Sequence, residues 1–328
     1  MSTIKVNAIE STSSGGVAAK IASINDGALS NRNLLHNSSY EIWQRGTAFS
    51  SAATGGNRYT ADRWSVPRRT RVARSTDVPA GFKYAILLDR EQTGGTEPFT
   101  LSQGIEERDI QFTGNYTLSF YAKSSDISTV NINVQDRTTV SEGGTNHSSI
   151  VTNQSVSITS SWARYTHTFS LSSTSLTGTC LRISIGNTSA SQHDELLLTG
   201  IQLETGSVAT NIEKRSFGHE LSLCYRYFYK NLQSPVGLFI ADAADAGKAY
   251  GFVRFPVTMR TAPTVVLADN NGNTDGKVTQ HGAAHNLAAT ASQIQKDGFC
   301  RVIRSSGTFN TLSARPIVAA VTSAEAEL

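Results

Sequence analysis

The sequence predicts an all-β protein, with a jelly-roll β-sandwich followed by a second, smaller β-sandwich and preceded by a short N-terminal segment. Apolar and polar residues alternate in short segments along most of the 328 residues, which is the period of half-buried strands. Turns rich in Gly, Ser, Thr and Asn separate these segments, and the charged share is only 17%. This composition favours strands and turns over helices.

The first 32 residues form a polar leader. Ile4, Val6 and Ala8 fall on one face of the short alternation TIKVNAI, which the run ESTSSGG then ends. A segment this short cannot form a core, so it is either disordered or ordered by a partner. It does not have the basic and then apolar pattern of a secretion signal, and the chain has no apolar run of the roughly 20 residues that cross a bilayer.

Residues 33–212 form the first predicted domain, in which strand segments follow one another between turns. The clearest faces are formed by Leu118, Phe120 and Ala122, by Val130, Ile132 and Val134, and by Tyr165, His167 and Phe169. The segment NLLHNSSYEIW (33–43) is expected to be the first strand, near the closing segment LLLTGIQLE. Strands of this length recurring between turns predict a jelly roll.

Residues 213–328 form the second predicted domain. The stretch SFGHEL predicts the start of a helix, and Tyr225, Tyr227 and Tyr229 then alternate as in a strand. Further strand segments are YGFVRFPV, TVVLAD, GKVTQ and FCRVIRS. These short segments predict the second, smaller sandwich.

Charge and cysteine content exclude several function classes. The net charge is +3 with a single basic run, so the composition gives no case for a nucleic-acid binder. That run either lines one strand face and attracts an anionic glycan or a partner, or forms a solvated edge that discourages aggregation; its arginines are Arg68, Arg69, Arg71 and Arg74. Three distant cysteines form neither a zinc ribbon nor a redox pair and are expected to be buried free thiols: Cys180, Cys224 and Cys300.

No catalytic motif is visible, so the sequence predicts that the protein is not an enzyme. Glu106, Glu107 and Asp109 lie together, but a glycosidase needs two carboxylates that face each other across a cleft. Their close spacing favours solvated charge. His281 and His285 would share a helix face as metal ligands, but the Gly and Ala residues between them disfavour a helix.

Aromatic side chains allow two interpretations. Trp43, Trp64 and Trp162 could stack on sugar rings, but their positions in strand segments favour the core or its edge. Tyr59, just before TADRW, is the better candidate for a glycan-contacting loop residue.

Several stretches together resemble a family of bacteriophage virion proteins, chiefly tail fibres. They are NLLHNSSYEIWQRGTAF, YTADRW, GIQLETGSVATNIEKRSFGHELSLCYRYFYK, MRTAPTVV and the terminal SAEAEL, in this order from residue 33 onward. The resemblance implies a carbohydrate-binding-module-like jelly roll and a β-sandwich tip, usually in a homotrimer. It also implies that the leader attaches to the virion, with Ile4, Val6 and Ile9 as the contact residues.

The resemblance implies further partners and sites. Residues 1–32 would bind other virion proteins (tail, nozzle, collar or capsid), and the sandwiches would contact host surface polysaccharide or lipopolysaccharide. The protein would be made in the host bacterial cytoplasm and reside in the virion. No cofactor is expected, although sugar-binding jelly rolls often hold a structural calcium near their first and last strands. Glu41 and Asp194 are the candidate ligands, and ordinary exposed carboxylates are the alternative.

Three functions remain open. The first is a short adhesive tail fibre, since the chain has no heptads or triple-helical repeat for a shaft. The second is an adaptor or a capsid- or collar-decorating protein without receptor binding. The third is a polysaccharide depolymerase, which usually carries a long repetitive β-helix, and no such repeat is visible.

Overall fold

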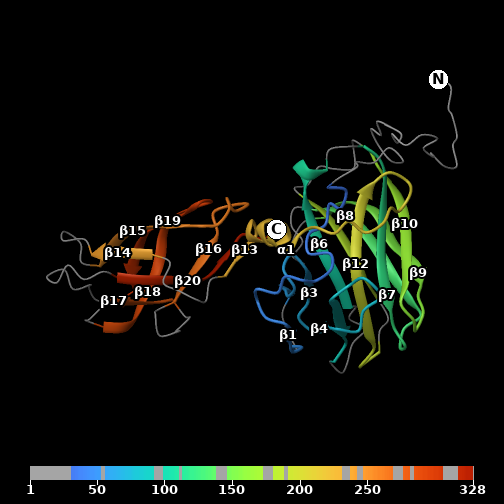
Figure 1. The fold of residues 1–328 in the computed structure, drawn as a ribbon, viewed down its shortest axis with the longest axis horizontal. Coiled ribbons are helices and arrows are strands. Elements are labelled where there is room, and N and C mark those ends of the chain that lie inside the picture. The colour runs from blue at the N-terminus through green and yellow to red at the C-terminus, as the bar shows by residue number, and fades with distance from the viewer. Residues whose placement is uncertain are drawn as a thin grey trace, which may run out of the picture.

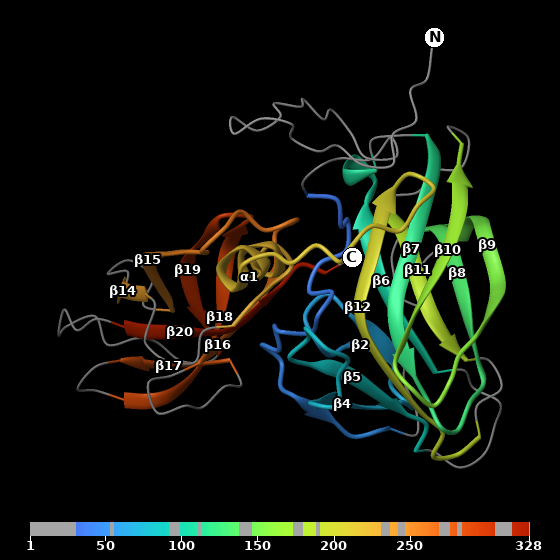
Figure 2. The same cartoon turned by 45° about the vertical axis from the view of Figure 1, so that its right-hand side comes forward.

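The computed structural model describes residues 31–52, 56–91, 99–110, 113–137, 146–172, 180–187, 191–230, 237–241, 247–268, 276–280, 284–305 and 317–327. Two β-rich units lie side by side, and the short helix α1 (Phe217–Tyr225) lies between them (Figures 1 and 2). No helix in these ranges is long and apolar enough to cross a membrane. Strands make up most of the secondary structure of the described residues, so the all-β prediction is confirmed.

The first unit consists of two six-stranded sheets. One sheet has the order β1-β4-β5-β12-β7-β10, with β1 at Ala48–Phe49, β4 at Arg71–Ser75, β5 at Ala85–Asp89, β12 at Glu195–Thr205, β7 at Gly114–Lys123 and β10 at Ala163–Leu171. The other has the order β2-β3-β6-β11-β8-β9, with β2 at Asn57–Tyr59, β3 at Ser65–Pro67, β6 at Phe99–Glu106, β11 at Cys180–Asn187, β8 at Thr129–Arg137 and β9 at Asn146–Ser157.

The strand order confirms the jelly roll. From β5 to β12, consecutive strands alternate between the two sheets except for the hairpin of β8 and β9, and all pairings are antiparallel. This is the eight-strand double Greek key of a jelly roll. The faces predicted for β7 and β8 are the buried ones: Leu118, Phe120, Ala122, Val130, Ile132 and Val134 all lie in the core between the sheets.

The expected first strand at 33–43 is not a strand. This segment has turns and irregular backbone, and the first strand is β1. Asn37 (φ +51°) and Tyr40 (φ +55°) have left-handed backbone, a conformation that interrupts an extended chain. The expected neighbourhood is confirmed, because the Leu34 N–H donates to the Leu203 carbonyl of β12 (2.9 Å).

The basic run does not line one strand face. Arg68 and Arg69 lie in the turn between β3 and β4. Arg71 and Arg74 lie three positions apart on β4, and side chains at odd separations in a strand point to opposite faces. Arg71 pairs with Asp89 at 2.7 Å.

The second unit is a sheet that closes on itself. Its order is β13-β20-β14-β15-β19-β18-β17, and β17 also pairs with β20, while β16 pairs with β20 alongside. The strands are β13 at Phe228–Tyr229, β14 at Gly237–Ala241, β15 at Lys248–Arg254, β16 at Thr264–Ala268, β17 at Lys277–Gln280, β18 at Ala284–Gln295, β19 at Gly298–Arg304 and β20 at Ile317–Glu325. Its core contains Phe239, Phe255, Phe299 and Val302.

Helix α1 begins where the sequence predicts, because the Ser216 side chain caps it and accepts from the His219 N–H. The strand expected over Tyr225–Tyr229 is limited to the two residues of β13. Tyr225 ends the helix, and Tyr227 lies in a turn whose N–H donates to the Cys224 carbonyl. Alternating tyrosines fit a strand only where a partner strand is available, and β20 reaches only Phe228 and Tyr229.

Candidate binding cavity between the jelly roll and helix α1

Side chains hold the stretch that begins at Asn33 against the jelly roll. The Asn33 side-chain nitrogen Nδ2 donates to the Ile201 carbonyl of β12 (3.0 Å). Its Oδ1 accepts from the N–H groups of Leu35 (3.0 Å) and Leu203 (3.1 Å). One buried amide thus satisfies backbone groups that a strand ladder would otherwise pair.

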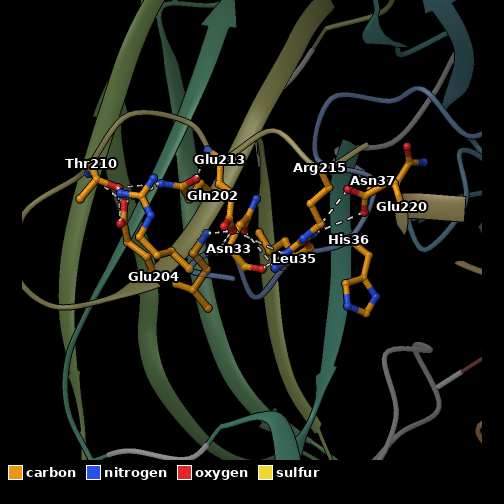
Figure 3. Close-up of polar contacts among 12 residues, drawn as sticks. Asn33, Leu35, His36, Asn37, Gln202, Glu204, Thr210, Glu213, Arg215 and Glu220 are labelled. Atoms are coloured by element: carbon orange, nitrogen blue, oxygen red, sulfur yellow. Dashed lines mark hydrogen bonds and ion pairs between the residues drawn. The ribbon is translucent and has the colours of Figure 1, made fainter. Parts of the chain in front are cut away.

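Arg215, between β12 and α1, holds the same stretch from the other side. Its guanidinium donates to the carbonyls of Asn33 and of Leu35, the latter at 3.0 Å. It also pairs with the Glu220 carboxylate at 3.4 Å. Glu220 lies in the first turn of α1, where a carboxylate is favoured, and accepts from the Asn37 N–H at 2.5 Å. Figure 3 shows these contacts as one continuous network.

The network continues along β12. Gln202 donates to Glu204 (2.7 Å) and accepts from the Glu213 N–H (2.8 Å). Thr210 donates to Glu204 through its N–H (2.9 Å) and its hydroxyl (2.6 Å), and Glu213 accepts from the Asn33 N–H (2.9 Å). We call this network the clasp; its residues are Asn33, Asn37, Gln202, Glu204, Thr210, Glu213, Arg215 and Glu220.

Glu106 joins the two β units, although the sequence predicted a solvated charge. Its carboxylate accepts from Nε and Nη2 of Arg226 (2.9 and 3.0 Å), from the Tyr227 hydroxyl (2.7 Å) and from Arg108 (2.8 Å). The prediction of a solvated charge is wrong for Glu106. This residue ends strand β6, and Arg226 and Tyr227, which follow helix α1, place their donors next to its carboxylate. Glu107 and Asp109 are exposed in a short 3₁₀ turn.

Glu327, near the C-terminus, returns to the jelly roll. It pairs with Arg63 at 2.5 Å and with Arg45 at 3.2 Å. The Arg63 side chain is 1% exposed; it also donates to the Gly104 carbonyl (2.6 Å) and lies 3.3 Å from the centre of the Tyr227 ring. We call this contact region the junction; its residues are Arg45, Arg63, Glu106, Arg226, Tyr227 and Glu327.

Asp62 adds a second link across the junction through Gln44. Both Asp62 oxygens accept from Gln44, and Gln44 also donates to the Phe228 carbonyl (2.8 Å) and accepts from the Lys230 N–H (3.1 Å). Burial raises the pKa of Asp62 to about 6, against the opposing effect of Arg45 at 3.9 Å. Strand β13 is thus bonded to the jelly roll through one amide side chain.

A cavity of about 560 Å³ lies where the clasp and the junction meet. Its size is within the usual range for small-ligand sites. The lining side chains are mostly basic, amide, hydroxyl and apolar, with one carboxylate: Asn31, Arg32, Asn33, Leu34, His36, Arg108, Asp109, Tyr116, Thr205, Arg215, His219, Leu223, Arg226 and Tyr227. The wall therefore combines many nitrogen donors with apolar and aromatic residues.

His36 is held neutral in this wall. Burial lowers its pKa well below the usual range, and the Arg63 and Arg215 guanidinium groups lower it further. Its Nδ1 is buried and has no hydrogen-bond partner, and its ring points away from the clasp contacts (Figure 3). Partial burial and the Glu106 carboxylate raise the pKa of Asp109, the one acidic side chain among the described lining residues.

The structure places the other predicted site residues apart from this cavity. Tyr59 lies on strand β2 and not in a loop, and its ring packs against Cys180 and Tyr227. Glu41 lies near the cap of α1 beside a smaller cavity, whereas Asp194 stabilises the turn before β12 by accepting from the Ser191 N–H. Among the described residues, no group of three or more His, Cys, Asp or Glu side chains could hold a metal ion.

The tryptophans and cysteines divide between core and surface. Trp64 is fully buried and Trp43 packs against the core, as expected. Trp162 instead donates to Asp77 (2.8 Å) near the surface. All three cysteines are free; two of them are buried and Cys300 is half-buried.

Some predicted residues cannot be placed. Ile4, Val6, Ile9 and His281 lie outside the described residues, and His285 lies on strand β18, which excludes the helix that a paired-histidine site would need.

Sequence reasoning missed the clasp and the junction. Their residues are far apart in the chain, and a single sequence does not reveal which buried charged residues pair with each other. The available signal was the concentration of charged and amide residues within three otherwise apolar stretches, 33–47, 59–64 and 202–228. Charged residues are rarely buried unless they are paired.

No family model matches the chain, and no curated protein matches it. Among solved structures, the chain is similar to the CBM22-1 xylan-binding domain of Paenibacillus barcinonensis Xyn10C, with 17% identity, 54% of this chain and 96% of that chain covered, and a TM-score of 0.35. A CBM4 structure has 15% identity, with 52% and 98% covered and a TM-score of 0.34.

The tailspike protein 4 of bacteriophage CBA120 is a third similar structure, with 16% identity and a TM-score of 0.34. Here the similarity covers 52% of this chain but only 21% of the tailspike chain.

Proposed function

We propose that this chain is a non-enzymatic phage virion protein, a short trimeric tail fibre that binds surface polysaccharide. The observation that carries the proposal is the donor-lined cavity beside the jelly roll, within a frame that many buried polar contacts hold in place. Arginine, histidine and amide donors together with apolar and aromatic lining residues suit the hydroxyl groups and apolar faces of sugars. The resemblance to virion proteins supplies the biological setting.

The absence of catalysis is part of the proposal. Hydrolysis of a glycosidic bond uses two carboxyl groups on either side of the bond. Asp109 is the only carboxylate among the described residues that line the cavity. Glu106 is engaged by Arg226, Tyr227 and Arg108, so it is not free to accept or donate a proton at a substrate.

The test is an array of bacterial capsular polysaccharides and lipopolysaccharides probed with the purified full-length chain. We expect binding to a subset of them, strengthened on dense arrays because linked sites gain avidity. A reducing-end assay on the bound polysaccharides should detect no cleavage. Binding to none of them by a chain with intact circular dichroism would contradict the proposal, and cleavage would favour a depolymerase.

Attachment to the virion makes a separate prediction. Deleting residues 1–30 should leave a folded protein, because the first residue of the clasp is Asn33. The truncated protein should fail to join the particle, as measured by its amount in purified virions. Normal incorporation would rule out Ile4, Val6 and Ile9 as the attachment contacts.

A second candidate function is decoration of the capsid or collar without receptor binding. The observation in its favour is that the sequence has no heptad or triple-helical repeat that would form a fibre shaft. Electron cryo-microscopy of particles carrying the labelled protein distinguishes the two. Three-fold clusters at the tail would support the fibre, and density over the capsid lattice would support decoration.

A further inference from the structure

The wall of the cavity holds more basic side chains than acidic ones. Four arginines and two histidines line it, against one carboxylate: Arg32, Arg108, Arg215, Arg226, His36 and His219 against Asp109. The carboxylates that pair with these arginines are Glu106, Glu213 and Glu220, and none of the three is part of the lining. The acidic partners therefore lie behind the guanidinium groups, and the wall itself presents nitrogen donors.

Two of these arginines differ in how they are paired. Arg108 is 60% exposed and contacts Glu106 through Nε at 2.8 Å, so most of its side chain is accessible to a ligand. Arg32 bonds only to neutral oxygens, the Thr210 hydroxyl (2.5 Å) and the Asn211 carbonyl (3.2 Å). A guanidinium that faces a cavity and has no carboxylate partner favours an anionic ligand.

The environment of His36 also favours an anionic ligand. Burial lowers the pKa of His36 most, and the positive charges around it lower that pKa further. A bound anion would offset those charges and partly relieve that penalty. The buried Nδ1 of His36 without a partner also marks a polar wall that is not saturated by contacts of this chain.

The apolar and aromatic lining residues indicate a ligand larger than a bare ion. Leu34, Leu223, Tyr116 and Tyr227 belong to the lining, and about 560 Å³ exceeds the volume that a single small anion fills. An apolar face with an anionic substituent and hydroxyl groups fits this combination. A sugar ring with a carboxylate or phosphate group has all three properties.

We propose that the cavity binds an acidic sugar residue, with Arg32 and Arg108 as the ligands of its anionic group. This inference rests on the proposed polysaccharide binding and names the class of saccharide. Arg215 and Arg226 act as positioning residues, because their nitrogens are already committed to the clasp and the junction. Asp109 opposes the ligand.

The probes come in matched pairs, so that charge is the only variable. Oligogalacturonate is compared with its methyl ester, sialyllactose with lactose, and mannose 6-phosphate with mannose. Binding to the full-length chain is measured by titration calorimetry or by chemical-shift changes. We expect at least one acidic member to bind about 10-fold or more tightly than its neutral partner, with an affinity that falls as salt rises.

Substitutions of the two arginines and of Asp109 should change the affinity for the acidic probe in opposite directions. Arg32→Gln and Arg108→Gln should each weaken binding of the acidic probe by about 10-fold, which corresponds to the loss of one charge-assisted hydrogen bond. Asp109→Asn should instead tighten binding several-fold, a gain that a purely structural role does not give. Arg68→Gln is the matched control, because Arg68 is exposed in the β3–β4 turn and should bind like the parent chain.

The outcomes separate this inference from the proposed function. Equal binding of acidic and neutral probes, with no effect of the three cavity variants, overturns the acidic-sugar inference and leaves polysaccharide binding standing. Failure of the chain to bind any saccharide, in these pairs or on the array, overturns both. Inorganic phosphate that competes as well as the acidic sugars would show an anion site without sugar recognition and would also overturn the inference.

Discussion

Replacing Arg63 with methionine should lower the free energy of unfolding by about 3–5 kcal/mol. The substitution removes one partner of a buried ion pair whose side chains are only 1% and 4% exposed. It leaves the Glu327 carboxylate with Arg45 alone and leaves the Gly104 carbonyl without the donor that reaches it at 2.6 Å. Arg63 also has left-handed backbone (φ +73°), a strain that methionine retains, so the loss reflects the side chain.

Urea unfolding followed by two spectroscopic signals can distinguish the two β units. All three tryptophans precede residue 163, so their fluorescence reports the jelly roll, whereas far-ultraviolet circular dichroism reports both β units. In the parent chain the two urea transitions should coincide, and in Arg63→Met they should separate as the second unit uncouples. Lys123→Met is the control, because Lys123 and Asp77 form a pair whose side chains are 31% and 46% exposed, and its loss should change stability by about 1 kcal/mol or less.

A double-mutant cycle with Glu327→Gln identifies the cause. If the ion pair accounts for the loss, the combined variant should be less destabilised than the sum of the two single variants. Additive losses together with coincident transitions in Arg63→Met would contradict a coupling role for the junction.

The strands were predictable from the sequence because their signal is local. In β7 and β8, alternate residues face the core, and the period of two appears directly in the sequence. The Ser216 cap of α1 is local as well. The closure of the second sheet was not predictable, since it depends on which residues of β20 meet β14 and β17, and that choice arises from distant segments.

The segment 33–43 was misassigned for a specific physical reason. Its density of apolar residues predicted a strand, and Leu35, Tyr40 and Ile42 are indeed buried. The backbone, however, is satisfied by amide side chains: Asn37 Oδ1 accepts from the Ile42 N–H (3.0 Å), and Asn37 Nδ2 donates to the Ile42 carbonyl (2.8 Å). Burial alone therefore does not distinguish a strand from a side-chain-bonded loop.

The stretches that carry the resemblance to virion proteins contain most of the clasp and junction residues. NLLHN supplies Asn33 and Asn37, YTADRW supplies Arg63, and the long segment from Gln202 to Tyr227 supplies the remainder of the clasp. These stretches therefore have a direct structural role in joining the jelly roll to α1 and to the second unit.

The candidate cavity was less predictable than the fold. Its lining comes from five separate parts of the chain, around residues 31–36, 108–109, 116, 205 and 215–227. No local pattern marks such a site, because each contributing stretch supplies only a few side chains. Tyr227 was expected as a strand residue, and its role at the junction follows from the turn after α1.

Replacing Arg215 with methionine should destabilise the chain by about 3 kcal/mol and release the stretch that begins at Asn33. The carbonyls of Asn33 and Leu35 would lose their donor, and a buried acceptor without a partner costs about 1–3 kcal/mol. Glu220, whose side chain is 12% exposed, would lose its cationic partner. Because Asn33 and Arg215 both line the cavity, binding of an acidic saccharide should weaken together with stability.

Hydrogen exchange locates this effect. The Leu34 N–H, bonded to the Leu203 carbonyl, and the Asn37 N–H, bonded to Glu220, should lose protection in Arg215→Met, while amides in the centre of β8 and β11 keep theirs. Lys214→Met is the neighbouring control, because Lys214 makes an exposed contact with the Gly81 carbonyl and should change stability by about 0.5 kcal/mol or less. Unchanged protection of Leu34 in Arg215→Met would show that Asn33 alone holds this stretch, and the clasp would then be centred on Asn33 and β12.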